Sequence, residues 1–477
     1  MVLLFQGKRL QVLSRGAIEW PLGSKDALEG CASMMSIARL FELDGRSVRF
    51  LRVYVFCAVA LCILAGVVVS AGDVWTFGGI DFRARLVGAR LLWSGIDPYS
   101  YVWMPDDPLR FGDPIARYPG PSRATYPPPL LAFYGLFDWL PYTVQRGVWA
   151  MLEWAAFLTT AALSLRLIPT RSVRFLFVAA VIAFMASSHY WRLHVERGQY
   201  YVFIALLLAI ELVLLDMSTG WRSRLRGVAL GIACALRPTV GLVVLLLWLG
   251  RDRTVAVRAL ATAAVLAVLA TLPVGGSMWL SYKANVDAIS EWVDHYAETD
   301  YADRTFGPVT HTAPTVIEGY DLTRSLEARS RNATVQGLMN GGGKPLATAL
   351  LLVWVCMSAA MLVWLGRCRA SRRTVAFVSL VCMVVSDLFM PIRFGYADVL
   401  FLPLAALGMT LWPGLPRPVR VVAGLMAAIA CVLSLPWLDS GTITVARDVC
   451  MFAACGILAL WCVAAARPHP SALAASA

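Results

Sequence analysis

Charged residues are scarce in this chain. Only 15% of its 477 residues are Asp, Glu, Lys or Arg, and 59% are hydrophobic. A soluble domain has about 25% charged and about 45–50% apolar residues. A soluble fold this apolar would expose large sticky patches. The composition therefore predicts a protein whose surroundings are lipid.

Paired cysteines are missing as well. None of the 11 cysteines forms a C-x-x-C pair, and most of them lie inside apolar runs. This pattern argues against a disulfide framework and against a metal site. We expect the cysteines to be small core residues, and we expect neither a metal nor a cofactor.

The net charge of +12 comes from short arginine clusters between apolar runs. This spacing is typical of the turns that stay in the cytoplasm, so it orients helices rather than binding nucleic acid. The alternating strands of an outer-membrane barrel are absent from the sequence. We therefore expect membrane-spanning helices.

The apolar runs predict an all-α polytopic integral membrane protein with about 10–12 transmembrane segments, since each crossing takes roughly 20 residues. We expect a cytoplasmic tail over residues 1–50, a transmembrane domain over 51–477, and two large periplasmic loops at 73–127 and 275–345. Met34 and Met35 offer a second translation start, which would leave residues 1–33 outside the native protein. The expected crossings are 53–72, 147–167, 175–188, 200–215, 259–274, 346–365, 374–390, 399–412, 421–435 and 449–466.

Two apolar stretches are too short or too interrupted to cross in the ordinary way. Residues 128–140 are expected to be re-entrant or interfacial, and Arg237-Pro238 divides 227–249 into two short pieces. Proline ends a helix, and a broken helix within a membrane is tolerated where it lines a cavity. An arginine at such a break is a candidate functional residue.

The first expected loop contains an arginine-rich amphipathic stretch. Apolar residues alternate with Arg83, Arg85 and Arg90 over 82–94, which predicts an interfacial helix. Asp81 stands at its start. It is either the helix cap or a general base that faces a lipid-linked substrate, and the residues alone leave both interpretations open.

A second cluster of polar residues lies at 189–199, between two expected crossings. It contains His189, Arg192, His194, Glu196 and Arg197. The cluster is either a hydrated loop or a pocket for a phosphate or a sugar. Two histidines without a third ligand argue against zinc.

Six short motifs occur in a fixed order between about residue 75 and residue 412. They are Gly79-Ile80-Asp81-Phe82, Leu92-Trp93-Ser94-Gly95 with Pro98-Tyr99, Tyr126-Pro127-Pro128, Arg197-Gly198-Gln199, Gly231 to Arg237-Pro238, and Ser386-Asp387 to Pro391. This ordered set resembles one family of GT-C glycosyltransferases, which includes the actinobacterial polyprenyl-phosphomannose-dependent mannosyltransferase of phosphatidylinositol mannosides and the branching arabinofuranosyltransferase of arabinan synthesis.

The resemblance implies a GT-C-like bundle and an enzyme of the bacterial cytoplasmic membrane. Its donor would be a polyprenyl-monophosphate sugar, arabinofuranose or mannose, and its acceptor a hydroxyl of a glycan, glycolipid or protein at the periplasmic face. Asp81 matches the family's acceptor base. The chain departs from the family at Arg237, where Lys is usual, at Tyr200, where Asn is frequent, and in a late turn that lacks the family's His.

The remaining site residues follow from charge and chemistry. Arginine suits bidentate contact with a phosphate, so the expected donor-phosphate ligands are Arg192, Arg197, Arg237 and Arg393. The expected contacts to donor or acceptor are Tyr126, His189, His194, Glu196, Gln199 and Tyr396.

Two other function classes remain open. Broken helices and buried charge are also features of transporters and lipid flippases. A glycan polymerase or ligase with a diphosphate-linked donor would likewise have many crossings and a large external loop. The position of Asp81 directly after the first crossing favours the GT-C interpretation.

Overall fold

The structure, a computed structural model, describes most of the chain. The described residues are 45–77, 79–115, 120–122, 124–168, 189–215, 220–249, 252–294, 343–390, 395–433 and 441–466, with short stretches at 173–174, 177–178, 181, 316–317, 320–321 and 334–335. The chain divides into two units, Met1–Ala58 and Val59–Ala477. The candidate site lies within the second unit.

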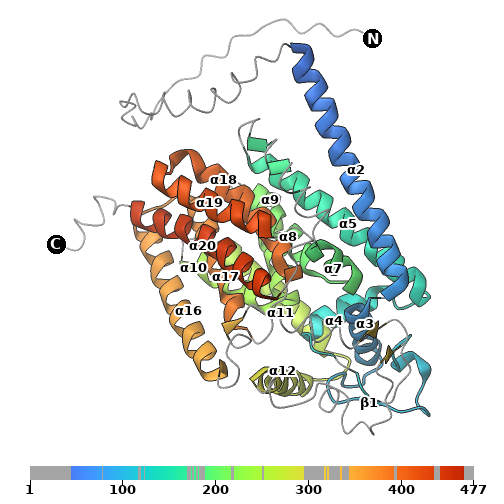
Figure 1. Ribbon diagram of the computed structural model, residues 1–477. Helices are drawn as coiled ribbons and strands as arrows, with labels where there is room; N and C mark the ends of the chain where they lie inside the picture. Colours follow the sequence, from blue (N-terminus) through green and yellow to red (C-terminus); the bar gives the residue numbers. More distant parts are fainter. Residues whose placement is uncertain are drawn as a thin grey trace, which may run out of the picture. The chain divides into compact units, whose positions relative to one another are not determined.

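Helices make up most of the described chain (Figure 1). The α-helices are α2 (Gly45–Phe77), α3 (Ile80–Trp93), α4 (Pro128–Tyr134), α5 (Tyr142–Leu167), α7 (His189–Arg197), α8 (Tyr201–Val213), α9 (Gly220–Leu236), α10 (Gly241–Leu249), α11 (Arg253–Thr271), α12 (Met278–Asp294), α16 (Gly343–Arg367), α17 (Arg372–Ser386), α18 (Phe401–Leu411), α19 (Arg417–Leu433) and α20 (Gly441–Ala465). The 3-10 helices are η1 (Leu109–Phe111), η2 (Gly135–Phe137), η3 (Pro238–Val240), η4 (Asp387–Phe389), η5 (Gly395–Leu400) and η6 (Trp412–Gly414). Two small antiparallel pairs complete the fold, β1 (Val102–Trp103) with β2 (Gly120–Pro121) and β3 (Val316–Ile317) with β4 (Tyr320–Asp321).

Among the described residues, 5 helical segments are long and apolar enough to cross a membrane: Tyr142–Leu167, Arg253–Thr271, Gly343–Arg367, Ala397–Gly414 and Val445–Ala465. The expected fold class, an all-α polytopic membrane protein, is therefore confirmed. The number of 10–12 crossings and the sidedness of the loops remain predictions.

The core lies where α5, α8, α10, α17 and α18 pack together (Figure 1). Helix α8 contacts α5, α9 and α18, and α17 contacts α10, α16 and α20. By contrast, α11 and α16 expose large apolar side chains, such as Val268 (59% exposed) and Leu352 (62% exposed). Such faces suit a lipid environment, because the exposed surface there need not be polar.

The predicted break at Arg237-Pro238 is present. Helix α9 ends at Leu236, Arg237 is extended (φ −141°, ψ 101°), and Pro238 begins η3 before α10. Proline disfavours a helical conformation at the preceding residue, which explains why the break falls at Arg237. The other irregular stretch forms α4, which has only 7 residues, followed by η2.

The predicted helix over 82–94 is also present as α3, and its interfacial location remains a prediction. In α3, Arg83 is 3% exposed and Arg85 is 0% exposed, and neither lies on a hydrated face. Burial is possible because each arginine of α3 has polar partners from other segments. Arg83 lies 3.5 Å from Asp113, and Arg90 donates to Asp138 at 2.6 Å.

Candidate active site

The first turn of α3 carries Asp81 at the edge of the bundle. The residue that caps the helix is Gly79, in a left-handed conformation (φ 65°), and no side chain caps it. Asp81 is therefore not the cap, which removes the simpler of its two interpretations. Its side chain is 20% exposed, and the partial positive charge of a helix N-terminus favours a carboxylate at this position.

The turn between α7 and α8 contacts the Asp81 carboxylate. Gly198 forms this turn with φ +68°, a left-handed conformation that favours glycine. The turn places the Gln199 amide so that Nε2 donates to Oδ2 of Asp81. Arg197 Nη1 lies 3.7 Å from Oδ1 of Asp81. The sequence-predicted residues Asp81, Arg197 and Gln199 thus come together, although 118 positions separate Asp81 from Gln199.

Arg85, one turn after Asp81 on α3, is the central cation of the site. Its Nη1 donates to the hydroxyl of Tyr134 at 2.9 Å and to the carbonyl oxygen of Gly198 at 3.0 Å. Its Nη2 donates to Oε1 of Gln199 at 2.6 Å and to the hydroxyl of Tyr126. Arg85 is not among the site residues expected from the sequence. The signal that points to it is its spacing of four residues from Asp81, because such pairs share one face of a helix.

Tyrosines surround the guanidinium of Arg85. Its Cζ lies 4.0 Å from the centre of the Tyr126 ring and 5.3 Å from that of Tyr200, within the range of cation–π contacts. Burial raises the pKa of Tyr126 to about 12. Burial opposes the charge on Arg85, but the neighbouring tyrosine hydroxyls and Asp81 outweigh it and raise the pKa of the guanidinium. The site therefore holds a fixed positive charge among neutral hydroxyl groups.

Rings in contact lead from Arg85 toward Arg237. Tyr126 packs edge-on against Tyr200 (5.9 Å between ring centres), and Tyr200 stacks on Tyr201 (4.6 Å). The Cζ of Arg237 then lies 4.7 Å from the Tyr201 ring centre. The two arginines are thus connected through a continuous row of rings, which we call the tyrosine row (Tyr126, Tyr200 and Tyr201).

Arg237 itself is held by polar partners at the break between α9 and α10. Its Nη2 lies 2.7 Å from Oδ1 of Asp387, and its Nε donates to Oγ1 of Thr239 at 2.9 Å. Its Nη1 is buried and has no hydrogen-bond partner among the described residues. No described atom therefore accepts a hydrogen bond from Nη1 of Arg237.

Two residues expected to bind substrate have protein partners in the structure. Arg192 donates two hydrogen bonds to the carboxylate of Asp73, at 2.6 and 2.7 Å, and these bonds raise the pKa of its guanidinium. His194 is 0% exposed, its Nδ1 lies 3.0 Å from Oε1 of Glu153, and its Nε2 accepts from the backbone N–H of Val202. Burial lowers the pKa of His194, which keeps the ring neutral.

The structure describes the remaining predicted site residues only in part. Glu196 is half-buried on α7, close enough to Arg192 for an electrostatic interaction. Arg393 lies outside the described residues, and so do the side chains of His189 and Tyr396. In the described part of the chain, no three His, Cys, Asp or Glu side chains are grouped so that they could hold a metal ion.

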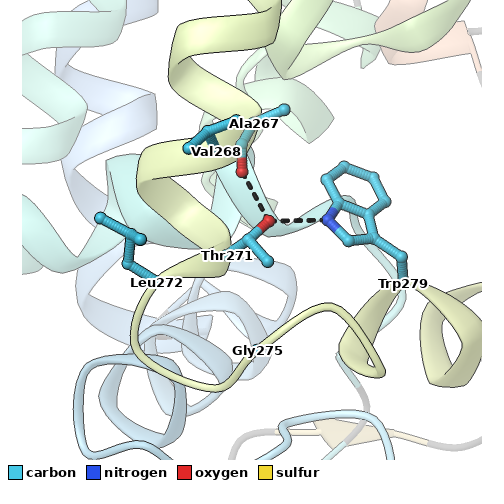
Figure 2. A pocket seen from close by; sticks show the side chains of 6 residues that line it. All are labelled: Ala267, Val268, Thr271, Leu272, Gly275 and Trp279. Carbon is cyan, nitrogen blue, oxygen red and sulfur yellow. Dashed lines mark hydrogen bonds between the residues drawn. The ribbon is translucent and has the colours of Figure 1, made fainter.

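A cleft of about 350 Å³ lies where α11 ends and α12 begins (Figure 2). Across it, Trp279 Nε1 donates to Oγ1 of Thr271 at 2.8 Å, and Thr271 donates to the carbonyl oxygen of Ala267. The remaining lining is mostly apolar and includes the 71% exposed Leu272. The cleft therefore opens on the apolar face of a helix that is long enough to cross a membrane.

Helix α12 also connects this cleft with the first loop. The rings of Trp279 and Tyr282 are in contact (6.1 Å between centres), and Tyr282 packs on Tyr99 (5.4 Å). The hydroxyl of Tyr99 donates to the carbonyl oxygen of Tyr126, and Asn285 of α12 donates to the carbonyl oxygen of Ala124. Two ring contacts and one hydrogen bond to the Tyr126 backbone therefore connect the cleft with the start of the tyrosine row.

Fold and site together define a helical membrane protein with a carboxylate, arginines and tyrosines gathered at one place. Residues 124–313 match the model of glycosyltransferase family 87. This match supports a membrane glycosyltransferase family of the GT-C type, and hence an enzyme that transfers a sugar. The matched segment contains Tyr126, Gln199 and Arg237, whereas Asp81 and Arg85 precede it. No curated protein and no solved structure matches the chain.

Proposed function

We propose that this enzyme transfers arabinofuranose or mannose from a polyprenyl-monophosphate donor to a hydroxyl acceptor at the periplasmic face of a bacterial cytoplasmic membrane. The acceptor is a hydroxyl of a glycan, glycolipid or protein. The observation that carries the proposal is the Asp81 carboxylate, oriented by Gln199 and flanked by Arg85 and Arg197. A partly exposed carboxylate beside arginines suits proton abstraction next to an anionic leaving group.

In the reaction, the carboxylate of Asp81 takes the proton of the acceptor hydroxyl. The acceptor oxygen forms a bond to the anomeric carbon, and the bond between that carbon and the phosphate oxygen breaks. The lipid phosphate leaves with the electron pair of the broken bond. The protein has to neutralise this charge and aim the hydroxyl, so no cofactor is required.

Arginine N–H groups suit the departing phosphate. Arg237 offers a buried Nη1 without a partner among the described residues, and Arg197 stands beside the base. The tyrosine row connects the two regions and presents hydroxyl groups and ring faces, which suit a sugar. Arg192 is not needed for this role, because its guanidinium holds Asp73.

The cleft between α11 and α12 supports a donor with a lipid chain. Its lining is mostly apolar, it opens on the exposed face of α11, and α12 connects it with Tyr126 through Tyr282 and Tyr99. A hydrocarbon chain gains about 0.8 kcal/mol for each CH₂ group that leaves water, so an apolar lining would keep the part of the chain nearest the phosphate out of water. The apolar lining and the exposed face of α11 therefore favour this cleft as the place where the prenyl chain would lie.

The proposed sidedness rests on the arginine clusters that we expect on the cytoplasmic side, such as Arg222 and Arg224 at the start of α9 and Arg372 at the start of α17. This assignment places the N-terminus in the cytoplasm. It also places the loop that contains Asp81 in the periplasm, where a lipid-linked sugar would be the available donor.

The experiment that tests this function compares membranes containing wild type or Asp81→Asn, each supplied with radiolabelled polyprenyl-monophosphate mannose or arabinofuranose. We expect the substitution to lower the transfer rate by about 10²–10⁴-fold, the usual contribution of a positioned base. Asp106→Asn is the matched control, because Asp106 is an exposed acid in the same loop.

Three results would count against the proposal. Transfer at the wild-type rate by Asp81→Asn would refute the role of Asp81 as base. Transfer only from a diphosphate-linked donor would favour a polymerase or ligase. Absence of transfer from every donor, together with substrate-driven flux across the membrane, would favour a transporter.

A further inference from the structure

The side-chain amide of Gln199 lies between two groups of opposite charge. Its Oε1 accepts from Nη2 of Arg85 at 2.6 Å, and its Nε2 donates to Oδ2 of Asp81. Rotating the amide by 180° would turn its N–H groups toward the guanidinium and its oxygen toward the carboxylate. Both contacts would then be repulsive, because an arginine only donates and a carboxylate only accepts. Arg85 and Asp81 therefore select the same orientation of Gln199.

Arg85 has little freedom of its own. Its side chain is 0% exposed, and Tyr134, Gly198 and Tyr126 each accept one of its hydrogen bonds. The ring of Tyr126 also covers the guanidinium at 4.0 Å. Since arginine presents its donors in one rigid plane, these partners fix the direction of the N–H that reaches Gln199.

The direct contact between Arg85 and Asp81 is longer, at 4.0 Å between Nη2 and Oδ2. The short path from the buried cation to the carboxylate runs through Gln199. We propose that Arg85 is a positioning residue, which acts through the Gln199 amide to hold Oδ1 of Asp81 toward the acceptor hydroxyl. This inference rests on the proposed function, in which Asp81 is the base.

The test measures kcat and KM for sugar transfer with the purified full chain in lipid nanodiscs, for Arg85→Lys, Gln199→Leu and the double variant. Lysine keeps the charge but lacks the rigid planar fork. We expect each single variant to lower kcat by about 100-fold, the effect of moving a reacting group by roughly 1 Å. The KM for the donor should change little. Arg90→Lys is the matched control, because Arg90 lies on the same helix and pairs with Asp138 away from Asp81.

The double variant distinguishes a relay from two separate roles. If Arg85 acts through Gln199, the double variant loses no more than the more impaired single variant; independent roles would instead multiply the two losses. Gln199→Glu adds a second readout. It keeps the size and the acceptor for Arg85, yet it offers Asp81 only oxygens, so it should be as impaired as Gln199→Leu.

Four outcomes would overturn the inference. These are multiplicative losses in the double variant, a wild-type kcat for Arg85→Lys, a wild-type kcat for Gln199→Glu, and lower kcat values that disappear once rates are divided by the amount of folded protein. If Asp81→Asn loses transfer while these variants keep it, only the positioning role fails. If Asp81→Asn keeps transfer, or the wild type transfers no sugar, both proposals fail.

Discussion

Replacing Gly198 by alanine tests the geometry of the site with the smallest available change. A Cβ at this position would lie 2.6 Å from Cβ of Phe82. Ordinary contacts between such atoms begin near 3.4 Å, so the two segments would have to separate by roughly 1 Å. Phe82 follows Asp81 in α3, and Gly198 precedes Gln199. The added methyl group therefore pushes apart the two segments that the Gln199–Asp81 hydrogen bond joins.

The magnitude has two parts. Gly198 has φ +68°, and a residue with a Cβ costs about 1–2 kcal/mol more in this left-handed region. A displacement of about 1 Å near the reacting groups typically costs about 10²-fold in rate. We therefore expect Gly198→Ala to lower kcat by about 100-fold and the free energy of unfolding by at least about 1–2 kcal/mol.

The assay measures sugar transfer from a radiolabelled polyprenyl-monophosphate donor, divided by the amount of folded protein from size-exclusion chromatography. Gly147→Ala is the control, since a Cβ there meets no atom within 4 Å and Gly147 lies inside α5. We expect the control to be fully active and slightly more stable, because alanine favours a helix by about 1 kcal/mol. Equal kcat values for Gly198→Ala and the control would refute this account of the site.

Three further predictions concern other parts of the molecule. Arg237→Ala leaves Asp387 buried without its partner and should lower the free energy of unfolding by about 3–5 kcal/mol, measured by thermal unfolding in detergent; Arg237→Met with Asp387→Leu should recover stability but not transfer. The pKa of His194 is lowered in the folded protein, so the unfolded chain binds a proton at this residue at a higher pH than the folded chain does. The free energy of unfolding should therefore keep its full value above about pH 6.5 and decrease below it by at most about 1.4 kcal/mol per pH unit, as measured by thermal unfolding between pH 5 and 8. Ala267→Trp fills the cleft and should raise the KM for a long-chain donor while leaving a short-chain donor unaffected.

Each of these three has its own contrary result. Recovery of transfer by the double variant would show that Arg237 serves stability alone. His194→Gln should remove its part of the pH dependence; an unchanged slope would place the titrating group elsewhere. An equal KM change for long and short donors would remove the cleft from the path of the lipid chain.

The helices were the most predictable feature of the sequence. Long apolar runs bounded by arginines placed α16 (expected 346–365) and α17 (expected 374–390) within a few residues of their observed ends. The break at Arg237 was predictable for a local reason, because proline restricts the residue before it. The break depends on a steric restriction between neighbouring residues, and the helix ends depend on the length of chain that crosses a membrane. Both properties can be recognised in the sequence.

The burial of α3 was not predictable in the same way. The arginines of α3 give the sequence pattern of a hydrated helix face. Their burial is possible only because polar partners far along the chain compensate for the loss of hydration. Arg85 finds Tyr134 and Gly198, which are 49 and 113 positions away. Arg192 finds Asp73, which is 119 positions away, so a residue expected to bind phosphate is instead an ion-pair partner. Sequence spacing alone carries no information on such contacts.

The hydrogen bond between Trp279 and Thr271 has a consequence for the motion of the cleft wall. A single neutral hydrogen bond stabilises a folded protein by about 1 kcal/mol. At room temperature this corresponds to a population ratio of roughly five to one between the bonded and released indole. The hydrogen bond that spans the cleft is therefore weak, and thermal motion alone breaks it and releases Trp279 for a substantial fraction of the time.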